Sequence, residues 1–170
     1  MLFLFLSALT AVNGQTIDTV HKKIPETWKR FYPGLRLGAG IQRSFYTEVG
    51  LSLQKYVYDE REGFIVPTIY AAFEWTPSTK GQKPVYGIKI GGETVRNGAS
   101  GGIEIKYMWN AGNEDVVFTP KLGFGLGFIN LLYGYNLSTR KYPFSKIGKH
   151  QFSLVINSNI FLYHIKSKKK

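Results

Sequence analysis

The chain has 170 residues, no cysteine and a formal net charge of +11 at pH 7. The absence of cysteine excludes disulfides, thiol chemistry, cysteine-based zinc sites and a lipoprotein anchor. The length suits one domain with a core of its own. The stretches read below as strands are close to neutral, so we expect no folded nucleic-acid-binding face. The positive charge gathers before the first strand (Lys22, Lys23, Lys29, Arg30), in one late loop (Arg140, Lys141, Lys146, Lys149) and in a tail (Lys166, Lys168, Lys169, Lys170).

The first 14 residues are typical of a secretory signal peptide. Residues 2–6 are apolar, and small residues precede a cleavage point before Gln15, although no basic residue follows Met1. The alternative interpretation is a buried helix or strand. Residues 15–33 are then expected to form a periplasmic lead-in, with a short helix starting near Pro25. No later run reaches the roughly 18 apolar residues that a membrane helix needs.

Apolar and polar residues alternate in eight stretches after this lead-in. Phe45, Thr47, Val49, Leu51 and Leu53 have polar or small residues between them. Since successive side chains of a strand point to opposite faces, such a stretch predicts a strand with one apolar and one polar side. The predicted strands cover residues 34–43, 45–56, 64–75, 85–95, 99–109, a sixth starting near 116, a seventh ending near 137, and 151–164. We therefore expect an all-β protein, an eight-stranded antiparallel transmembrane β-barrel (an up-and-down meander) over residues 34–164, and a basic periplasmic tail over 165–170.

The connections between these strands are predicted from turn-forming residues. Asn97 and Gly98 indicate a tight hairpin turn, because both accept positive φ angles. Loops are expected at residues 76–83, 110–115 and 138–150, the last being the longest. The turn between strands six and seven stays open among the glycines of residues 123–127. With an even number of strands both ends of the barrel lie on one side, which is periplasmic in outer-membrane barrels, and the longer loops face outward.

The polar face of the strands favours a membrane barrel over a soluble one. Four acidic and four basic residues on it would neutralise one another in a closed lumen, whereas each would be costly to bury alone. We predict a lumen charge network formed by Arg36, Glu48, Glu74, Lys89, Glu93, Glu104, Lys106 and Lys121. The other residues of this face are mostly small, which suits a narrow interior. A soluble, lipocalin-like barrel is the alternative, but its outer face would need to be rich in charged residues.

Aromatic residues fall near the ends of the predicted strands, where an interfacial belt would place them. The predicted interfacial aromatics are Phe45, Trp75, Tyr86, Trp109, Tyr133 and Tyr135.

The pattern resembles a known class of membrane protein. The eight glycine-rich strands, the signal before Gln15 and the aromatic last strand resemble small outer-membrane barrels of the OmpA/OmpX type. The stretches 119–123 and 129–136 resemble small barrels common in Bacteroidota. The resemblance implies the fold and a location in the outer membrane of a Gram-negative bacterium, but little about activity. Such barrels often end on an aromatic residue, whereas here Phe161 and Tyr163 precede a lysine-rich tail.

Three functions are compatible with these observations. We expect a structural or accessory-subunit role without catalysis, a cofactor or a metal. The expected partners are outer-membrane lipid, lipopolysaccharide and a larger outer-membrane protein complex. The first alternative is a narrow channel or transport protein that uses the lumen charges. The second is a lipid-modifying enzyme, because lipid A deacylases and palmitoyltransferases resemble this chain in size. Such a deacylase needs a serine activated by a histidine, and the candidates are His150 with Ser153 and His164 with Ser158.

Overall fold

The computed structural model describes residues 31–59, 63–78, 81, 83–140 and 143–158. These residues form strands and their connections and contain no helix. The strands are β1 (Phe31–Ile41), β2 (Phe45–Lys55), β3 (Val57–Asp59), β4 (Gly63–Thr76), β5 (Val85–Arg96), β6 (Ala99–Asn110), β7 (Asn113–Gly125), β8 (Ile129–Tyr135), β9 (Leu137–Ser138) and β10 (His150–Asn157). The predicted signal peptide, most of the predicted lead-in and the predicted basic tail lie outside the described residues.

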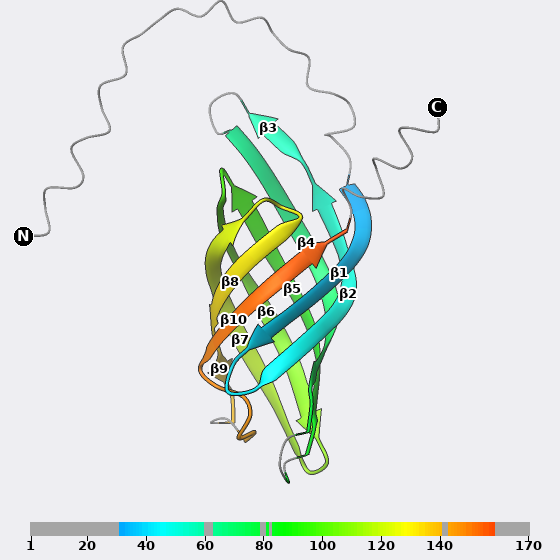
Figure 1. The fold of residues 1–170 in the computed structure, drawn as a ribbon, viewed down its shortest axis with the longest axis vertical. Helices are drawn as coiled ribbons and strands as arrows, with labels where there is room; N and C mark the ends of the chain where they lie inside the picture. Colours follow the sequence, from blue (N-terminus) through cyan, green and yellow to red (C-terminus); the bar gives the residue numbers. More distant parts are fainter. Residues whose placement is uncertain (1–30, 60–62, 79–80, 82, 141–142, 159–170) are drawn as a thin grey trace, which may run out of the picture.

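The strands form one antiparallel sheet that closes on itself (Figure 1). β1 pairs with β2 on one side and with β10 on the other, so the first and last strands join. The short strand β3 continues β2 along β4, and the short strand β9 continues β8 along β7. The barrel wall therefore has eight strand positions, which we call staves. Closure removes the unpaired edge that an open sheet would expose. The prediction of an all-β, eight-stranded antiparallel meander barrel is confirmed.

The barrel has two distinct ends. The terminal end, uppermost in Figure 1, holds the start of β1, the end of β10 and the short turns that follow β5 and β7. The loop end holds the turns at residues 42–44 and 111–112, the end of β4, the start of β5 and the described residues of the segment between β9 and β10. As predicted, the longest connection lies opposite the end at which the described chain begins and finishes.

Several turns follow the predicted chemistry, and one predicted loop is wrong. Asn97 and Gly98 have φ angles of 49° and 91°, as expected for the Asn-Gly turn. Instead of a loop at 110–115, Asn110 pairs with Asn113 across a two-residue turn in which Gly112 has φ of 124°. The pairing of β6 with β7 therefore extends into the polar residues 110 and 113–115, which the sequence predicts to lie in a loop.

The remaining strand boundaries also shift. β1 starts at Phe31, three residues before the predicted position. The turn left open between strands six and seven lies at residues 126–128, where Gly127 has φ of 83°. β10 is described as a strand as far as Asn157, and residues 159–164 of the predicted last strand lie outside the described part of the chain.

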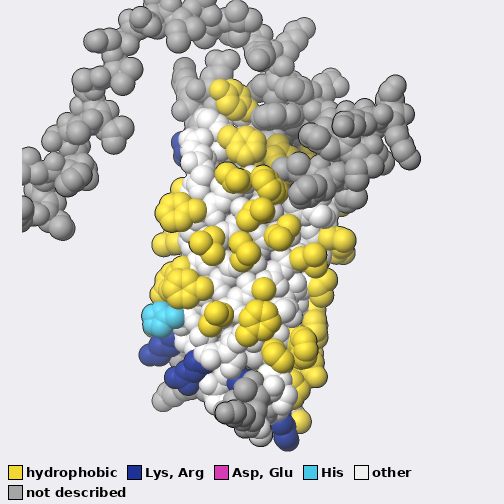
Figure 2. All heavy atoms as spheres, viewed as in Figure 1, with side chains coloured by type: hydrophobic (Ala, Val, Ile, Leu, Met, Phe, Trp, Pro, Cys, Tyr) yellow, Lys and Arg dark blue, Asp and Glu magenta, His cyan; other side chains and the backbone are white. Residues whose placement is uncertain are grey.

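The two faces of the wall differ sharply in chemistry. Large apolar side chains are exposed on the outside of all eight strands of the barrel wall, and Figure 2 shows them spread over the part of the wall that is visible. On the inside, the buried residues are mainly polar or charged. This arrangement is the reverse of a soluble protein, in which the apolar side chains form the interior.

The six predicted interfacial aromatics all lie at the loop end. Each stands at the start or finish of a strand that begins or ends there, and each is exposed or half-buried. At the terminal end, a second set of aromatic residues was not predicted: Phe31, Tyr58 and Phe124 are 56%, 47% and 74% exposed. The apolar wall is therefore flanked by aromatic rings at both ends.

Candidate functional site: the barrel lumen

All eight residues of the predicted charge network are buried inside the barrel. They come from six strands: Arg36 from β1, Glu48 from β2, Glu74 from β4, Lys89 and Glu93 from β5, Glu104 and Lys106 from β6, and Lys121 from β7. Each lies at an inward position of its strand's alternation. The sheet thus brings together charges that are up to 85 residues apart in the sequence (36 to 121).

Arg36 is the most highly connected cation towards the terminal end of the lumen. Its Nη1 and Nη2 donate to the two carboxylate oxygens of Glu93 at 2.8 and 3.2 Å, and its Nε donates to Oε1 of Glu48 at 2.9 Å. The guanidinium Cζ lies 3.6 Å from the ring centroid of Tyr70. Asn130 Nδ2 donates to Oε1 of Glu93 at 3.1 Å. Such forked pairing holds both planar groups in one geometry.

Two lysines continue the network towards the loop end, and a third lies nearer the terminal end. Lys89 Nζ contacts Oε2 of Glu48 and lies 2.9 Å from Oε2 of Glu74. Lys106 Nζ lies 3.4 Å from that same Glu74 oxygen and 3.2 Å from Oε1 of Glu104. Their ammonium groups therefore alternate with carboxylates along the lumen.

The third lysine closes the network across the barrel. Lys121 Nζ contacts Oε2 of Glu104 and donates to the hydroxyl of Tyr70 at 2.9 Å. The same Tyr70 hydroxyl donates to Glu104 at 2.7 Å. Tyr70 thus joins the lysine part of the network to Arg36. Each of the four carboxylates contacts at least one of the four cations, so the network carries no net charge.

Two inward tyrosines fill space that glycines leave open. A Cβ atom on Gly91 would lie 2.5 Å from the hydroxyl of Tyr70, and one on Gly40 would lie 2.5 Å from the hydroxyl of Tyr46. Both contacts are shorter than real Cβ contacts, so these positions require glycine for the rings to enter. Glycines on the polar face thus accommodate large rings in an interior that eight strands make narrow.

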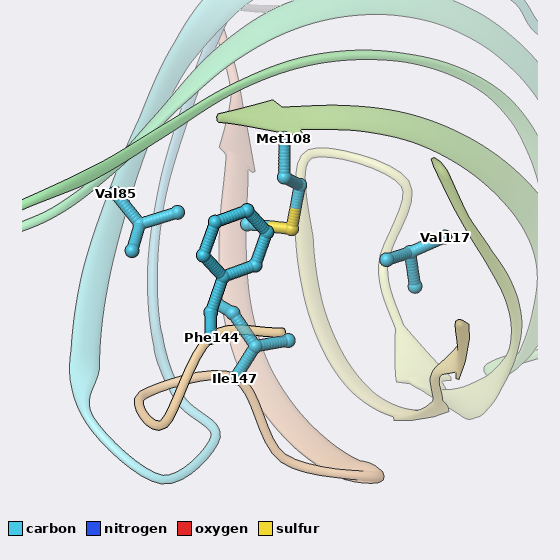
Figure 3. Packing of buried hydrophobic residues seen from close by; sticks show 5 residues of the cluster. All are labelled: Val85, Met108, Val117, Phe144 and Ile147. Atoms are coloured by element: carbon cyan, nitrogen blue, oxygen red, sulfur yellow. The ribbon is translucent and has the colours of Figure 1, made fainter. Parts of the chain in front are cut away.

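The loop end of the lumen is closed by a small apolar cluster. Phe144 and Ile147, from the segment between β9 and β10, pack on Val85, Met108 and Val117, and Figure 3 shows the Phe144 ring between Val85 and Met108. All five side chains are buried. We call these five residues the plug cluster. The segment therefore turns into the barrel mouth.

Polar contacts fix this segment in place. Lys146 is buried and donates from Nζ to the carbonyl oxygen of Pro77 at 2.7 Å. Asn136 donates from Nδ2 to the carbonyl of Gly148 at 2.7 Å. Asp115 is also buried and accepts from Thr139 Oγ1 at 2.9 Å and from the Arg140 backbone N–H at 3.1 Å. The sequence predicts a loop over 138–150 but does not predict that its apolar residues Phe144 and Ile147 fill the mouth of the barrel.

The terminal end is covered by the turn between β7 and β8. The carbonyl of Gly127 accepts from Gln54 Nε2 at 2.7 Å and from Asn157 Nδ2 at 3.4 Å. Gln54 comes from β2, which is separated from this turn by β1, β10 and β8 in the sheet. The turn therefore bends across the mouth. Both ends of the charged lumen are capped by the chain's own residues.

The structure separates the residues of the candidate catalytic pair. His150 and Ser153 lie on opposite faces of β10: His150 is exposed, and its Nδ1 lies 2.7 Å from the Tyr133 hydroxyl. Ser153 is buried and donates to the carbonyl of Leu132 at 3.4 Å. A histidine cannot activate a serine across the wall. In the second candidate pair, the Ser158 hydroxyl accepts from the Leu35 N–H at 3.0 Å, and His164 lies outside the described residues.

Two features are absent from the described residues. No three His, Cys, Asp or Glu side chains there are grouped so as to hold a metal ion. No helix long and apolar enough to cross a membrane is found among them.

Comparison with known proteins identifies no relative of this chain. The chain matches no protein-family model, and searches of curated proteins and of solved structures found no match.

Proposed function

We propose that this chain is a sealed integral barrel of the outer membrane of a Gram-negative bacterium, of the OmpA/OmpX type, that serves as a structural or accessory subunit. The observation that carries the proposal is the reversed distribution of polarity. Large apolar side chains are exposed on the outside of every stave, whereas the eight charges are buried inside. In a hydrocarbon layer the apolar outer face meets an apolar environment, and the closed barrel keeps its charged inner face away from that environment.

The dimensions of the wall support insertion into a bilayer. Six of the described strands have 11 to 14 residues, against the 9 to 11 that a tilted strand needs to cross the hydrocarbon layer. A soluble monomer rarely exposes an apolar patch larger than a few hundred Å². Here Leu51, Ile90 and Ile103, which lie in the middle of their strands, are 67%, 59% and 56% exposed. The wall is therefore unsuited to water.

The filled lumen favours an accessory role over a channel. Eight strands leave an interior that side chains just fill. In this barrel the charges are paired with one another, and both mouths are capped by the plug cluster at one end and by the Gly127 turn at the other. An ion would have to separate buried ion pairs to pass. The surfaces that remain for interaction are the lipid-facing wall and the two rims.

The sealed-barrel proposal predicts folding in lipid without conductance. Urea-unfolded full-length chain diluted into phospholipid vesicles should give a heat-modifiable, protease-resistant band, because the apolar wall needs hydrocarbon. Dilution into buffer alone should give aggregate. In planar bilayers the inserted protein should show no steady current. The Lys89→Ala variant, which removes one cation from the network, is recorded under the same conditions for comparison. A folded monomer in buffer, or a steady current from the unaltered protein, would contradict the proposal.

The accessory role predicts a companion. The chain expressed with a C-terminal tag in its native outer membrane and extracted in mild detergent should co-purify with one protein at fixed stoichiometry. The matched control is the Ile105→Arg variant, which disrupts the wall and should lose that companion. A barrel that elutes alone from native membranes under these conditions would contradict the accessory role, although not the fold.

A further inference from the structure

A hollow lies on the outer wall at the loop end. It has a volume of about 690 Å³, within the range of small-molecule sites. Its lining comes from the β5–β6 wall, the β6–β7 hairpin and the segment after β9, with Ile88, Tyr107, Trp109, Asn110, Glu114 and Arg140 among the lining residues. We call it the rim hollow. Towards the middle of the wall its lining is apolar, and at the rim it is polar.

The aromatic part of the rim hollow is formed by Tyr107 and Trp109, which belong to a larger group of rings on the wall. Tyr107 and Trp109 are stacked, with ring centroids 5.7 Å apart and planes 28° apart. Trp109 also contacts Tyr86 and Phe73, at centroid distances of 6.3 and 6.4 Å. Aromatic surfaces of this kind provide large contact areas for ring-shaped partners and sit at the boundary between hydrocarbon and water.

The polar part of the rim hollow holds a positioned arginine. Arg140 Nη2 lies 3.0 Å from Oε1 of Glu114, and Tyr107 donates its hydroxyl proton to Oε2 of Glu114 at 2.7 Å. The side chains of Arg140 and Glu114 are 61% and 50% exposed. An arginine has five N–H donors, and the contact with Glu114 occupies only part of that fork. The guanidinium therefore lies beside the hollow with N–H donors left for an incoming anion.

The charge of the loop end favours an anionic occupant. Among the described residues of that end, Arg43, Lys83, Arg140 and Lys149 are exposed, against Glu114 as the exposed carboxylate. Figure 2 shows Lys and Arg side chains together below the apolar wall at this end. Basic residues at a membrane surface attract anionic headgroups.

We propose that the rim hollow binds the phosphorylated sugar headgroup of a lipid A-type glycolipid. Arg140 donates to the phosphate, the sugar ring packs on Tyr107 and Trp109, and the first carbons of an acyl chain lie along Ile88. The combination of a cation, an aromatic surface and an apolar path matches a phosphosugar joined directly to acyl chains. The inference rests on the proposed function, since the loop end must lie in the outer leaflet for this lipid to reach it.

The test uses the full chain folded in detergent micelles. Binding of bisphosphorylated lipid A and of its dephosphorylated form is measured by calorimetry. We expect the dephosphorylated form and the Arg140→Gln variant each to weaken binding on the order of tenfold, the effect of losing one charge-assisted hydrogen bond. Glu114→Gln should bind more tightly than the unaltered protein, because it removes the carboxylate that competes for Arg140. Arg43→Gln, on the same rim but outside the hollow, should change affinity less than twofold.

Each other outcome overturns the inference in a distinct way. Equal losses for Arg140→Gln and Arg43→Gln would show diffuse attraction by the rim instead of a site. Equal affinity for phosphatidylglycerol micelles would make the occupant a glycerol lipid. Weaker binding by Glu114→Gln would show that the ion pair acts only on local structure. The heat-modifiable shift of each variant is recorded first, so that failure to fold, which counts against the proposed function, is distinguished from failure to bind.

Discussion

Replacing Arg36 by methionine should lower the free energy of unfolding by about 3–5 kcal/mol. The guanidinium contacts both Glu48 and Glu93, and all three side chains are buried. Glu48 keeps Lys89 as a partner, but the only cation that contacts Glu93 within the described residues is Arg36. The substitution therefore leaves an uncompensated carboxylate inside the barrel, where water cannot solvate it.

Urea titration of the vesicle-inserted protein measures this loss. Arg43→Met, at an exposed position of the loop end, is the matched control and should stay within about 0.5 kcal/mol of the unaltered protein. The double variant Arg36→Met, Glu93→Met should recover a large part of the stability, because it removes the stranded charge with its partner. If Arg36→Met and Arg43→Met lower the free energy of unfolding by the same amount, the lumen network does not stabilise the fold.

Replacing Ile105 by arginine should cost about 2–4 kcal/mol in vesicles, the value for a cation at the middle of the lipid-facing side of a barrel. Ile105 lies at the centre of β6 and is 49% exposed on the outer wall. In water, the same substitution at an exposed position would cost little. The size of the effect therefore reports whether hydrocarbon surrounds this position.

Ile41→Arg provides the depth control for this experiment. Ile41 is the last residue of β1, at the loop end, and is 60% exposed. A cation there reaches the interface, so the expected cost falls to about 0–1 kcal/mol. Unfolding in urea from vesicles of one lipid composition gives both values. Equal costs at Ile105 and Ile41, or no cost at either, would contradict a membrane-spanning wall.

The alternation of residues was sufficient to predict the wall and the inward charges. Arg36 and Glu93 stand at inward positions because side chains alternate along a strand, whatever the neighbouring strands do. Their pairing could not be predicted, because β1 and β5 are not neighbours in the sheet. That contact depends on the closure and narrowness of the barrel, which no local pattern encodes.

The contacts that were not predicted depend on the room available inside the barrel and not on the alternation of residues along a strand. Phe144 and Ile147 lie in a basic segment without alternation, and they are buried because the open mouth offers an apolar surface on Val85 and Met108. Asp115 falls in the loop predicted over 110–115, yet it lies in β7 and anchors the segment after β9. One available signal was the presence of two large apolar residues within a loop otherwise rich in lysine.

The charge network also constrains the order in which the barrel can assemble. Arg36 and Glu48 belong to the first hairpin, but Glu93, the forked partner of Arg36, is 57 residues further along the chain. A first hairpin that entered hydrocarbon alone would hold the Arg36–Glu48 pair, but the two Nη groups of Arg36 that bind Glu93 would have no carboxylate, at a cost of several kcal/mol. The strands must therefore gather their inward faces before or during insertion. The same ion pairs that seal the finished lumen thus make its formation a concerted event, with slow kinetics expected from contacts so distant in sequence.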